Sequence, residues 1–280
     1  MTSSLQARLL GLTSMQGETH YMARINQSLC LGCYLRDGIT LEQLIKFAAE
    51  TGFAAVEFWA REGVPCEEVF ALTQQYGLRI ASMSGHGTLT EGMNDPANHS
   101  RIIDEIHESI DLAVKWNIPG LITFSGNRRG MDDIRGAENC AECLSHVVKH
   151  AEEAQINLNM ELLNSKVNHP DYQCDHTRWG VHVCKMVGSP RAKLLYDIYH
   201  MQIMEGDLIR TIGDSIDYIG HFHTAGNPGR RDMDDTQEIY YPAVMRAIAD
   251  SGFELFVGHE FGAKGEVFAP LKAAFDTCNV

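Results

Sequence analysis

Two kinds of segment alternate along this chain from about residue 26 onward. Short runs of β-branched and aliphatic residues, most of which end in a polar residue, are each followed by a longer amphipathic stretch. The first pair is residues 27–33 and a helix that opens at Thr40, where Gln43 completes a capping-box pattern, and ends at Gly52. Strands that alternate strictly with helices predict a parallel sheet with right-handed crossovers.

The number of strands favours a closed barrel over an open, doubly wound sheet. The first strand–helix loop lacks the G-x-G-x-x-G pattern of dinucleotide-binding sheets, and eight strands suit closure. We therefore predict an α/β fold, a single (β/α)₈ TIM barrel over residues 25–280, preceded by a flexible N-terminal extension over residues 1–24. The expected strands are residues 27–33, 54–59, 79–84, 120–124, 157–162, 193–197, 218–223 and 255–260.

Charge and hydropathy narrow the range of partners. The 280 residues carry a formal net charge of −14, which disfavours nucleic acid and anionic membranes because both attract positive surfaces. No run approaches 18 consecutive apolar residues, and the N-terminal segment is too interrupted for a signal peptide. We expect a cytoplasmic protein that acts on a small molecule, and the sequence is compatible with a homo-oligomer.

Eight cysteines raise the question of a zinc or disulfide framework. They include two C-x-x-C pairs, Cys30/Cys33 and Cys140/Cys143, which lie too far apart for a zinc ribbon. The first pair falls in a strand-like run and the second in a helical stretch. Free thiols are the favoured interpretation.

Four residues of types that bind metal ions lie at the carboxyl ends of four consecutive predicted strands, which is where the active sites of such barrels are found. These residues are Glu161, Asp197, His223 and Glu260. Three carboxylates and one imidazole form an oxygen-rich set that suits Mn²⁺ or Mg²⁺ best and is also compatible with Co²⁺ or Zn²⁺. His221 shares a face with His223 but lies one pleat deeper, so it is the weaker candidate. The simpler alternative is that strand-end acids cap helices or pair with basic residues on the rim.

Four further side chains are candidates for substrate binding. His200 follows Asp197 by three residues and could polarise a substrate oxygen; the alternative is a loop histidine packed on Tyr199. Arg230 leaves a tight Gly–Pro turn and could grip a carboxylate, although solvated arginines are common. The list is completed by two polar residues at other strand ends, Glu57 and His86.

With these residues identified, the sequence resembles the xylose-isomerase-like barrel superfamily and, within it, the hydroxypyruvate isomerase group. The resemblance is carried by VEFW at strand 2, MELLN around Glu161, YDIYH around Asp197, HFHTAGNPGR from His221, EIYY, and GHEF around Glu260. It implies that Glu161, Asp197, His223 and Glu260 bind one divalent cation. It also implies that Glu161 and Glu260 act as an acid/base pair and that His200 and Arg230 hold substrate oxygens.

Two departures from that group touch the substrate side. Strand 7 supplies His223 where some bacterial hydroxypyruvate isomerases carry Gln, and residues 231–238 replace a loop usually richer in Gly and Pro. The expected reaction is the interconversion of hydroxypyruvate and tartronate semialdehyde. The alternatives are a ketose 3-epimerase or a related sugar isomerase with the same metal site, an endonuclease-IV-like repair enzyme, which the net charge disfavours, and a barrel that only binds a ligand.

Overall fold

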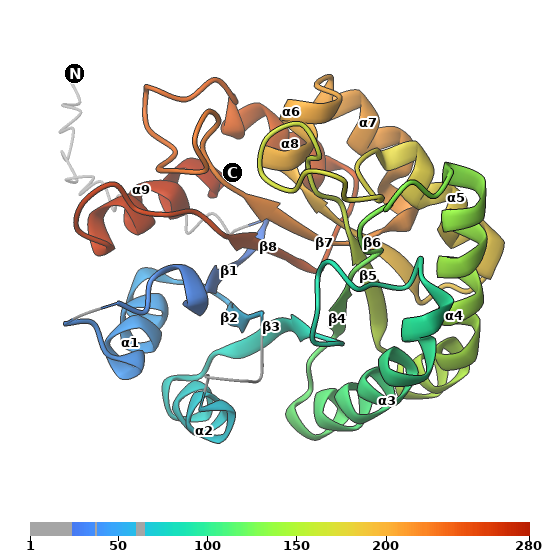
Figure 1. Cartoon of the computed structure of the whole chain (residues 1–280). Helices are drawn as coiled ribbons and strands as arrows, with labels where there is room; N and C mark the ends of the chain where they lie inside the picture. The colour runs from blue at the N-terminus through green and yellow to red at the C-terminus, as the bar shows by residue number, and fades with distance from the viewer. Residues whose placement is uncertain (1–23, 37, 60–64) are drawn as a thin grey trace, which may run out of the picture.

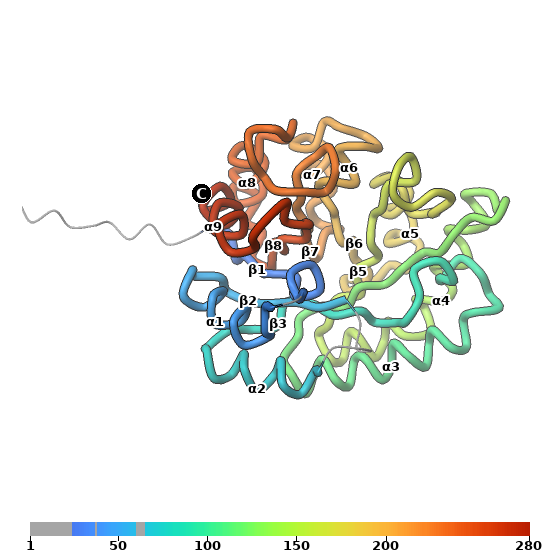
Figure 2. The backbone as a smooth tube through the Cα atoms, turned by 60° about the vertical axis from the view of Figure 1, so that its left-hand side comes forward, coloured from blue at the N-terminus to red at the C-terminus, as the bar shows by residue number. Residues whose placement is uncertain are grey.

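A closed barrel of eight parallel strands forms the centre of this protein, whose computed structural model describes residues 24–36, 38–59 and 65–280. Each strand pairs with its neighbours in chain order, and β1 and β8 lie side by side to close the circle (Figures 1 and 2). This confirms the predicted α/β barrel. The strands are β1 (Asn26–Cys30), β2 (Ala55–Phe58), β3 (Arg79–Ser84), β4 (Gly120–Thr123), β5 (Asn157–Glu161), β6 (Ala192–Asp197), β7 (Ile219–Thr224) and β8 (Phe256–His259).

Amphipathic helices surround the barrel and cover the outside of the strands (Figure 1). The first of them shows why they form where they do. Thr40 accepts a hydrogen bond from the Gln43 backbone N–H, and the Gln43 side chain accepts one from the Thr40 N–H, so the expected capping box is present. The helices are α1 (Leu41–Thr51), α2 (Cys66–Tyr76), α3 (His99–Trp116), α4 (Asp133–Ala154), α5 (Thr177–Val187), α6 (Ile198–Met204), α7 (Leu208–Ser215), α8 (Tyr241–Asp250) and α9 (Phe268–Cys278).

The connection between β6 and β7 differs from the simple alternation of one helix after each strand. Two helices occupy it, because α6 starts directly after Asp197, whose Oδ1 accepts a hydrogen bond from the His200 backbone N–H at 3.0 Å. The alternative interpretation of Asp197 as a helix cap is therefore correct for one of its two oxygens. Its other oxygen, Oδ2, is left facing the barrel rim.

Several other expectations can be compared with the described residues. Of the expected N-terminal extension over residues 1–24, only Arg24 belongs to the described residues. The four cysteines of the two C-x-x-C pairs are free thiols, as predicted. Among the helices of the described ranges, none is both long and apolar enough to cross a membrane.

Candidate metal and active site

The four predicted metal ligands come together at one rim of the barrel. One ligand atom from each of Glu161, Asp197, His223 and Glu260 lies within 4.8 Å of the others. Glu161 and Asp197 end β5 and β6, His223 lies in β7, and Glu260 follows β8 directly. Parallel pairing brings Asp197 and His223 to the same level, since they are register partners. All four side chains are buried.

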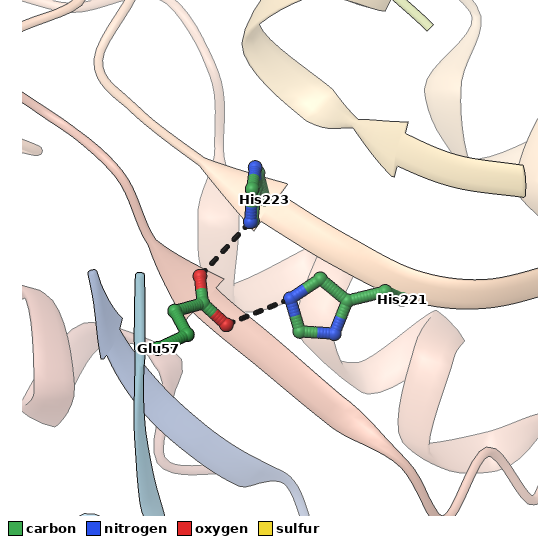
Figure 3. A group of neighbouring side chains, drawn as sticks. All are labelled: Glu57, His221 and His223. Atoms are coloured by element: carbon green, nitrogen blue, oxygen red, sulfur yellow. Dashed lines mark ion pairs between the residues drawn. The ribbon is translucent and has the colours of Figure 1, made fainter. Parts of the chain in front are cut away.

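The two ring nitrogens of His223 face different groups. Nδ1 lies 3.0 Å from Glu260 Oε2 and 3.6 Å from Glu161 Oε1. Nε2, on the other side of the ring, lies 2.9 Å from Glu57 Oε1 (Figure 3). Nδ1 is therefore the nitrogen available to a cation held by the carboxylates, and Nε2 pairs with a carboxylate behind it. This is the arrangement in which an outer carboxylate orients a metal-binding histidine.

Glu57 does not have the substrate-binding position that the sequence suggested. It lies between the two histidines of β7, with Oε2 2.8 Å from His221 Nε2 and Oε1 near His223 (Figure 3). Ser28 Oγ also donates a hydrogen bond to Oε2 at 2.9 Å. Glu57 reaches across from β2 because Gly258, the β8 neighbour of both Ser28 and His223, has no side chain; a Cβ atom there would collide with the carboxylate. His221 lies deeper than His223, as expected.

Burial and the charges of neighbouring side chains shift the pKa values of these groups in opposite directions. Burial raises the pKa of Asp197 to about 7, against the lowering effect of Arg230. Burial likewise raises the pKa of Glu161. For Glu260, burial is outweighed by the positive charges of Arg230 and His223, which lower its pKa. Burial would also lower the pKa of His223, but the charges of Glu260 and Glu57 raise it. The cluster thus concentrates buried negative charge, which a cation would neutralise.

Arg230 brings a fixed positive charge to this cluster. Its backbone has a φ of 56° in the turn after β7, which is closed by hydrogen bonds between Gly226 and Arg231. The guanidinium donates to the Glu260 carboxylate, and Nη2 lies 3.5 Å from Asp197 Oδ2. Arg230 therefore lies beside the candidate ligands, as the sequence predicted.

His200 is fully buried and lies outside the set of described residues that line the main cavity. Its Nδ1 accepts a hydrogen bond from the Asn164 backbone N–H at 3.1 Å, so a neutral ring carries its proton on Nε2. Nε2 lies 3.6 Å from Asp197 Oδ2, and burial lowers the pKa of the ring. The structure thus places the His200 ring next to Asp197, with Nε2 buried and without a hydrogen bond in the described part of the chain, and its role in binding a substrate oxygen stays a prediction.

A cavity of about 760 Å³ opens from the cluster. Glu161, Glu260 and Arg230 line it, together with the predicted His86 and the unpredicted His169. His86 Nε2 accepts a hydrogen bond from the Phe124 N–H at 2.9 Å, and burial lowers the pKa of His86 to about 4, so the ring is neutral. The position of His169 in the loop after β5 was the one signal that could have identified it, since such loops build barrel sites.

Comparison with known proteins identifies the family. A family model described as "Xylose isomerase-like TIM barrel" matches residues 45–277. This chain belongs to that family. Within it, the chain is similar to proteins named "Putative hydroxypyruvate isomerase": it is 30% identical to the one from Mus musculus over 242 residues, which is 82% of this chain and 87% of the relative. The corresponding human protein is 25% identical over 239 residues, covering 81% and 86%.

Other proteins that are similar to this chain carry the names of different reactions. A "2-oxo-tetronate isomerase" from Pectobacterium atrosepticum is 24% identical, covering 79% of this chain and 86% of the relative. Among solved structures, "AP endonuclease, family 2" from Brucella melitensis superposes with a TM-score of 0.81 at 23% identity, covering 92% of this chain and 100% of that one. A D-psicose 3-epimerase from Clostridium cellulolyticum H10 gives 0.73 at 18%, covering 91% and 98%. These structures share the fold, and the named relatives identify this family member as an isomerase.

The donor set fits a divalent cation. Three carboxylates and one imidazole nitrogen are hard ligands of the kind that Mn²⁺ and Mg²⁺ prefer. His223 Nδ1 is buried and makes no hydrogen bond within the described part of the chain, although carboxylates surround it. Nε2 of His223 makes no such hydrogen bond either, but only Nδ1 faces the carboxylates of Glu161 and Glu260, so Nδ1 is the nitrogen placed to join them as a ligand.

Proposed function

We propose that this isomerase interconverts hydroxypyruvate and tartronate semialdehyde by metal-assisted proton transfer through an enediolate. The observation that supports this most is the convergence of Glu161, Glu260 and Arg230 on one cavity, with Asp197 and His223 completing a four-ligand cluster. Moving a proton from one carbon to its neighbour requires groups that accept and return the proton. It also requires a nearby site that stabilises the negative charge on oxygen.

Glu161, Asp197, Glu260 and Nδ1 of His223 would hold the cation, with Mn²⁺ or Mg²⁺ preferred and Co²⁺ or Zn²⁺ compatible. When bound, it supplies Lewis-acid stabilisation of the negative charge that develops on the substrate oxygens. Glu57 then acts through His223, which it contacts, and His200, whose ring lies next to Asp197, is proposed to hold a substrate oxygen.

Glu161 and Glu260 are the proposed acid/base pair. One glutamate removes a proton from the hydroxymethyl carbon of hydroxypyruvate, and the enediolate forms as the electron pair moves onto the carbonyl oxygen. The same or the opposite glutamate returns a proton to the neighbouring carbon, and a hydroxyl proton passes from one oxygen to the other. The product is the aldehyde with a hydroxyl group on the central carbon, so atoms and charge balance.

Arg230 is the proposed anchor for the substrate carboxylate, because a guanidinium can donate two parallel hydrogen bonds to it. His86 is proposed to hold a polar group of the substrate as a neutral ring. The ketose 3-epimerase alternative uses the same cluster on a neutral sugar, which does not require the arginine. A barrel that only binds a ligand would need no acid/base pair.

Proton NMR in D₂O tests the proposal directly. Hydroxypyruvate and a panel of ketohexoses are incubated separately with the protein, with Mn²⁺ added and then removed by a chelator. We expect metal-dependent conversion or deuterium exchange in hydroxypyruvate. Exchange at a ketose carbon with hydroxypyruvate untouched would move the assignment to the epimerases. No exchange in any substrate, with no metal retained, would support the binding-only barrel.

A further inference from the structure

Two histidines face each other on the outside of the barrel. His107 belongs to α3 and His150 to α4, and these two helices pack side by side (Figure 1). The Nδ1 atoms of the two rings are 2.9 Å apart, the ring centroids are 5.1 Å apart, and the ring planes are inclined by only 27°. Two basic nitrogens from different helices are therefore directed toward the same small space.

A carboxylate lies at the far side of one of these rings. Asp111 Oδ1 is 3.4 Å from His150 Nε2. In a neutral ring this contact favours the proton on Nε2, which leaves the lone pair of His150 Nδ1 free to accept a proton donor or a cation. The sequence of carboxylate, imidazole and open nitrogen is the arrangement in which outer carboxylates orient metal-binding histidines.

The separation of the two Nδ1 atoms matches two ligands of one metal ion. With metal–nitrogen bonds of about 2.0–2.1 Å, two imidazole nitrogens lie about 2.9 Å apart at a right angle and about 3.3 Å apart at the tetrahedral angle. The observed 2.9 Å between His107 and His150 suits neighbouring positions of a square-planar or octahedral ion. Turning each ring about its Cβ–Cγ bond, a soft rotation in histidine, aims both lone pairs at one ion.

Solvent can reach this pair of histidines. His107 is half-buried, the His150 side chain is 31% exposed, and the Asp111 side chain is 76% exposed. An ion can therefore enter from solution and keep water at its remaining positions. Imidazole donors suit Ni²⁺, Cu²⁺ and Zn²⁺, whereas the oxygen-rich cluster at the barrel rim suits Mn²⁺ and Mg²⁺. The two places thus differ in the ions that they select.

We infer that His107 and His150 form a second metal site, which binds one imidazole-preferring divalent transition-metal ion through both Nδ1 atoms while Asp111 orients His150. The bound ion joins α3 to α4 and stabilises the folded chain, because only folding brings the two ligands together. The inference is independent of the reaction proposed above, since neither histidine is among the described residues that line the main cavity.

Calorimetric titration of the full chain with Ni²⁺, in saturating Mg²⁺, tests the site. Compared with the unaltered protein, His107→Gln and His150→Gln should each bind one equivalent fewer, or bind it at least about tenfold more weakly, since one ligand of two is lost. The control is His182→Gln, which removes an exposed histidine of α5 and should change nothing. Identical Ni²⁺ binding by all four proteins would overturn the inference and leave a hydrogen-bonded pair.

Electron paramagnetic resonance of bound Cu²⁺ identifies the ligands. The cluster at the rim provides one imidazole, that of His223, whereas the α3–α4 pair provides two. We expect hyperfine splitting from two imidazole nitrogens in the unaltered protein and its loss in His150→Gln. Splitting from a single nitrogen in both proteins would mean that Cu²⁺ binds only at the rim, which would refute the second site.

Two further measurements separate a lost ligand from a damaged fold. Mn²⁺ affinity at the rim cluster should be unchanged in His107→Gln and His150→Gln, because neither residue belongs to that cluster. Asp111→Asn keeps both ligands and removes only the outer charge, so Ni²⁺ affinity should fall by about tenfold, the low end for such partners. Unchanged Ni²⁺ affinity in Asp111→Asn would contradict the orienting role of Asp111.

Discussion

His223 depends on Glu57 for its orientation and charge, and both oxygens of Glu57 are engaged by histidines. Glu57→Gln keeps the shape but removes the negative charge, and its amide group must face one of the two rings. We expect the affinity for Mn²⁺ to fall about 10- to 100-fold, as for other partners of metal-binding histidines. Titration of Mn²⁺ monitored by its electron paramagnetic resonance signal measures this.

Ser28→Ala provides the matched comparison for Glu57→Gln. It removes one hydrogen bond to Glu57 Oε2 and leaves the carboxylate and both histidine contacts intact. The loss of Mn²⁺ affinity should therefore be smaller than for Glu57→Gln, because the negative charge that faces His223 is kept. If Glu57→Gln bound Mn²⁺ as tightly as the unaltered protein, Glu57 would not position the ligand.

The proposed acid/base pair makes a second prediction for single residues. Glu161→Gln and Glu260→Gln each remove a group that must accept or return a proton, so turnover should fall by at least about 10²–10⁴-fold. Because both residues are also candidate ligands, activity is measured at saturating Mn²⁺ with bound metal determined in parallel. Near-normal turnover in either variant would contradict the scheme.

Strand ends were the part of the site that the sequence could predict. The rule that barrel chemistry lies at the carboxyl ends of strands selected Glu161, Asp197, His223 and Glu260 without knowledge of side-chain contacts. The same rule placed Glu57 wrongly. A strand-end carboxylate can turn to the rim or into the barrel, and the outcome depended on a glycine on another strand.

Loops and helix starts were less predictable for a similar reason. The early start of α6 depends on one oxygen of Asp197 capping it, and the burial of His200 follows from that start. His169 lies in the loop after β5 with no periodicity that could have singled it out. Alternation and periodicity therefore predicted the barrel as a whole, whereas pairwise contacts determined the supporting residues.

Gly258 gives a prediction at the level of the strand. Gly258→Ala places a methyl group where the Glu57 carboxylate lies, so β8 or Glu57 must move. Overpacking of this kind costs about 1–3 kcal/mol of unfolding free energy. Chemical denaturation measures the cost, and Mn²⁺ affinity should fall with it because Glu57 is displaced from His223.

Gly213→Ala tests whether the steric explanation for Gly258 is right. Gly213 lies inside α7, and a Cβ atom there would meet no atom within 4 Å. Alanine in an open helical position should stabilise the protein by about 0.5–1 kcal/mol. Opposite signs for the two substitutions support the explanation, and a neutral Gly258→Ala would exclude a close approach of Glu57.

At the scale of the whole molecule, the buried cluster connects metal binding, pH and stability. Burial raises the pKa of Asp197 to about 7, so at pH 6 most of the metal-free protein carries a proton there. A cation must displace that proton at pH 6 but not at pH 8, which makes binding about tenfold weaker at pH 6. The proton on His223, whose pKa is also raised, acts in the same direction.

Thermal and chemical unfolding with saturating Mn²⁺ and with chelator, at both pH values, would measure this coupling. Because a ligand stabilises the native state in proportion to the logarithm of its affinity, the stabilisation by Mn²⁺ should be about 1.4 kcal/mol smaller at pH 6 than at pH 8. The chelated samples correct for the effect of pH on the metal-free protein. Equal stabilisation at both pH values would mean that no proton leaves the cluster when the metal binds, which would contradict a protonated Asp197 in the metal-free protein at pH 6.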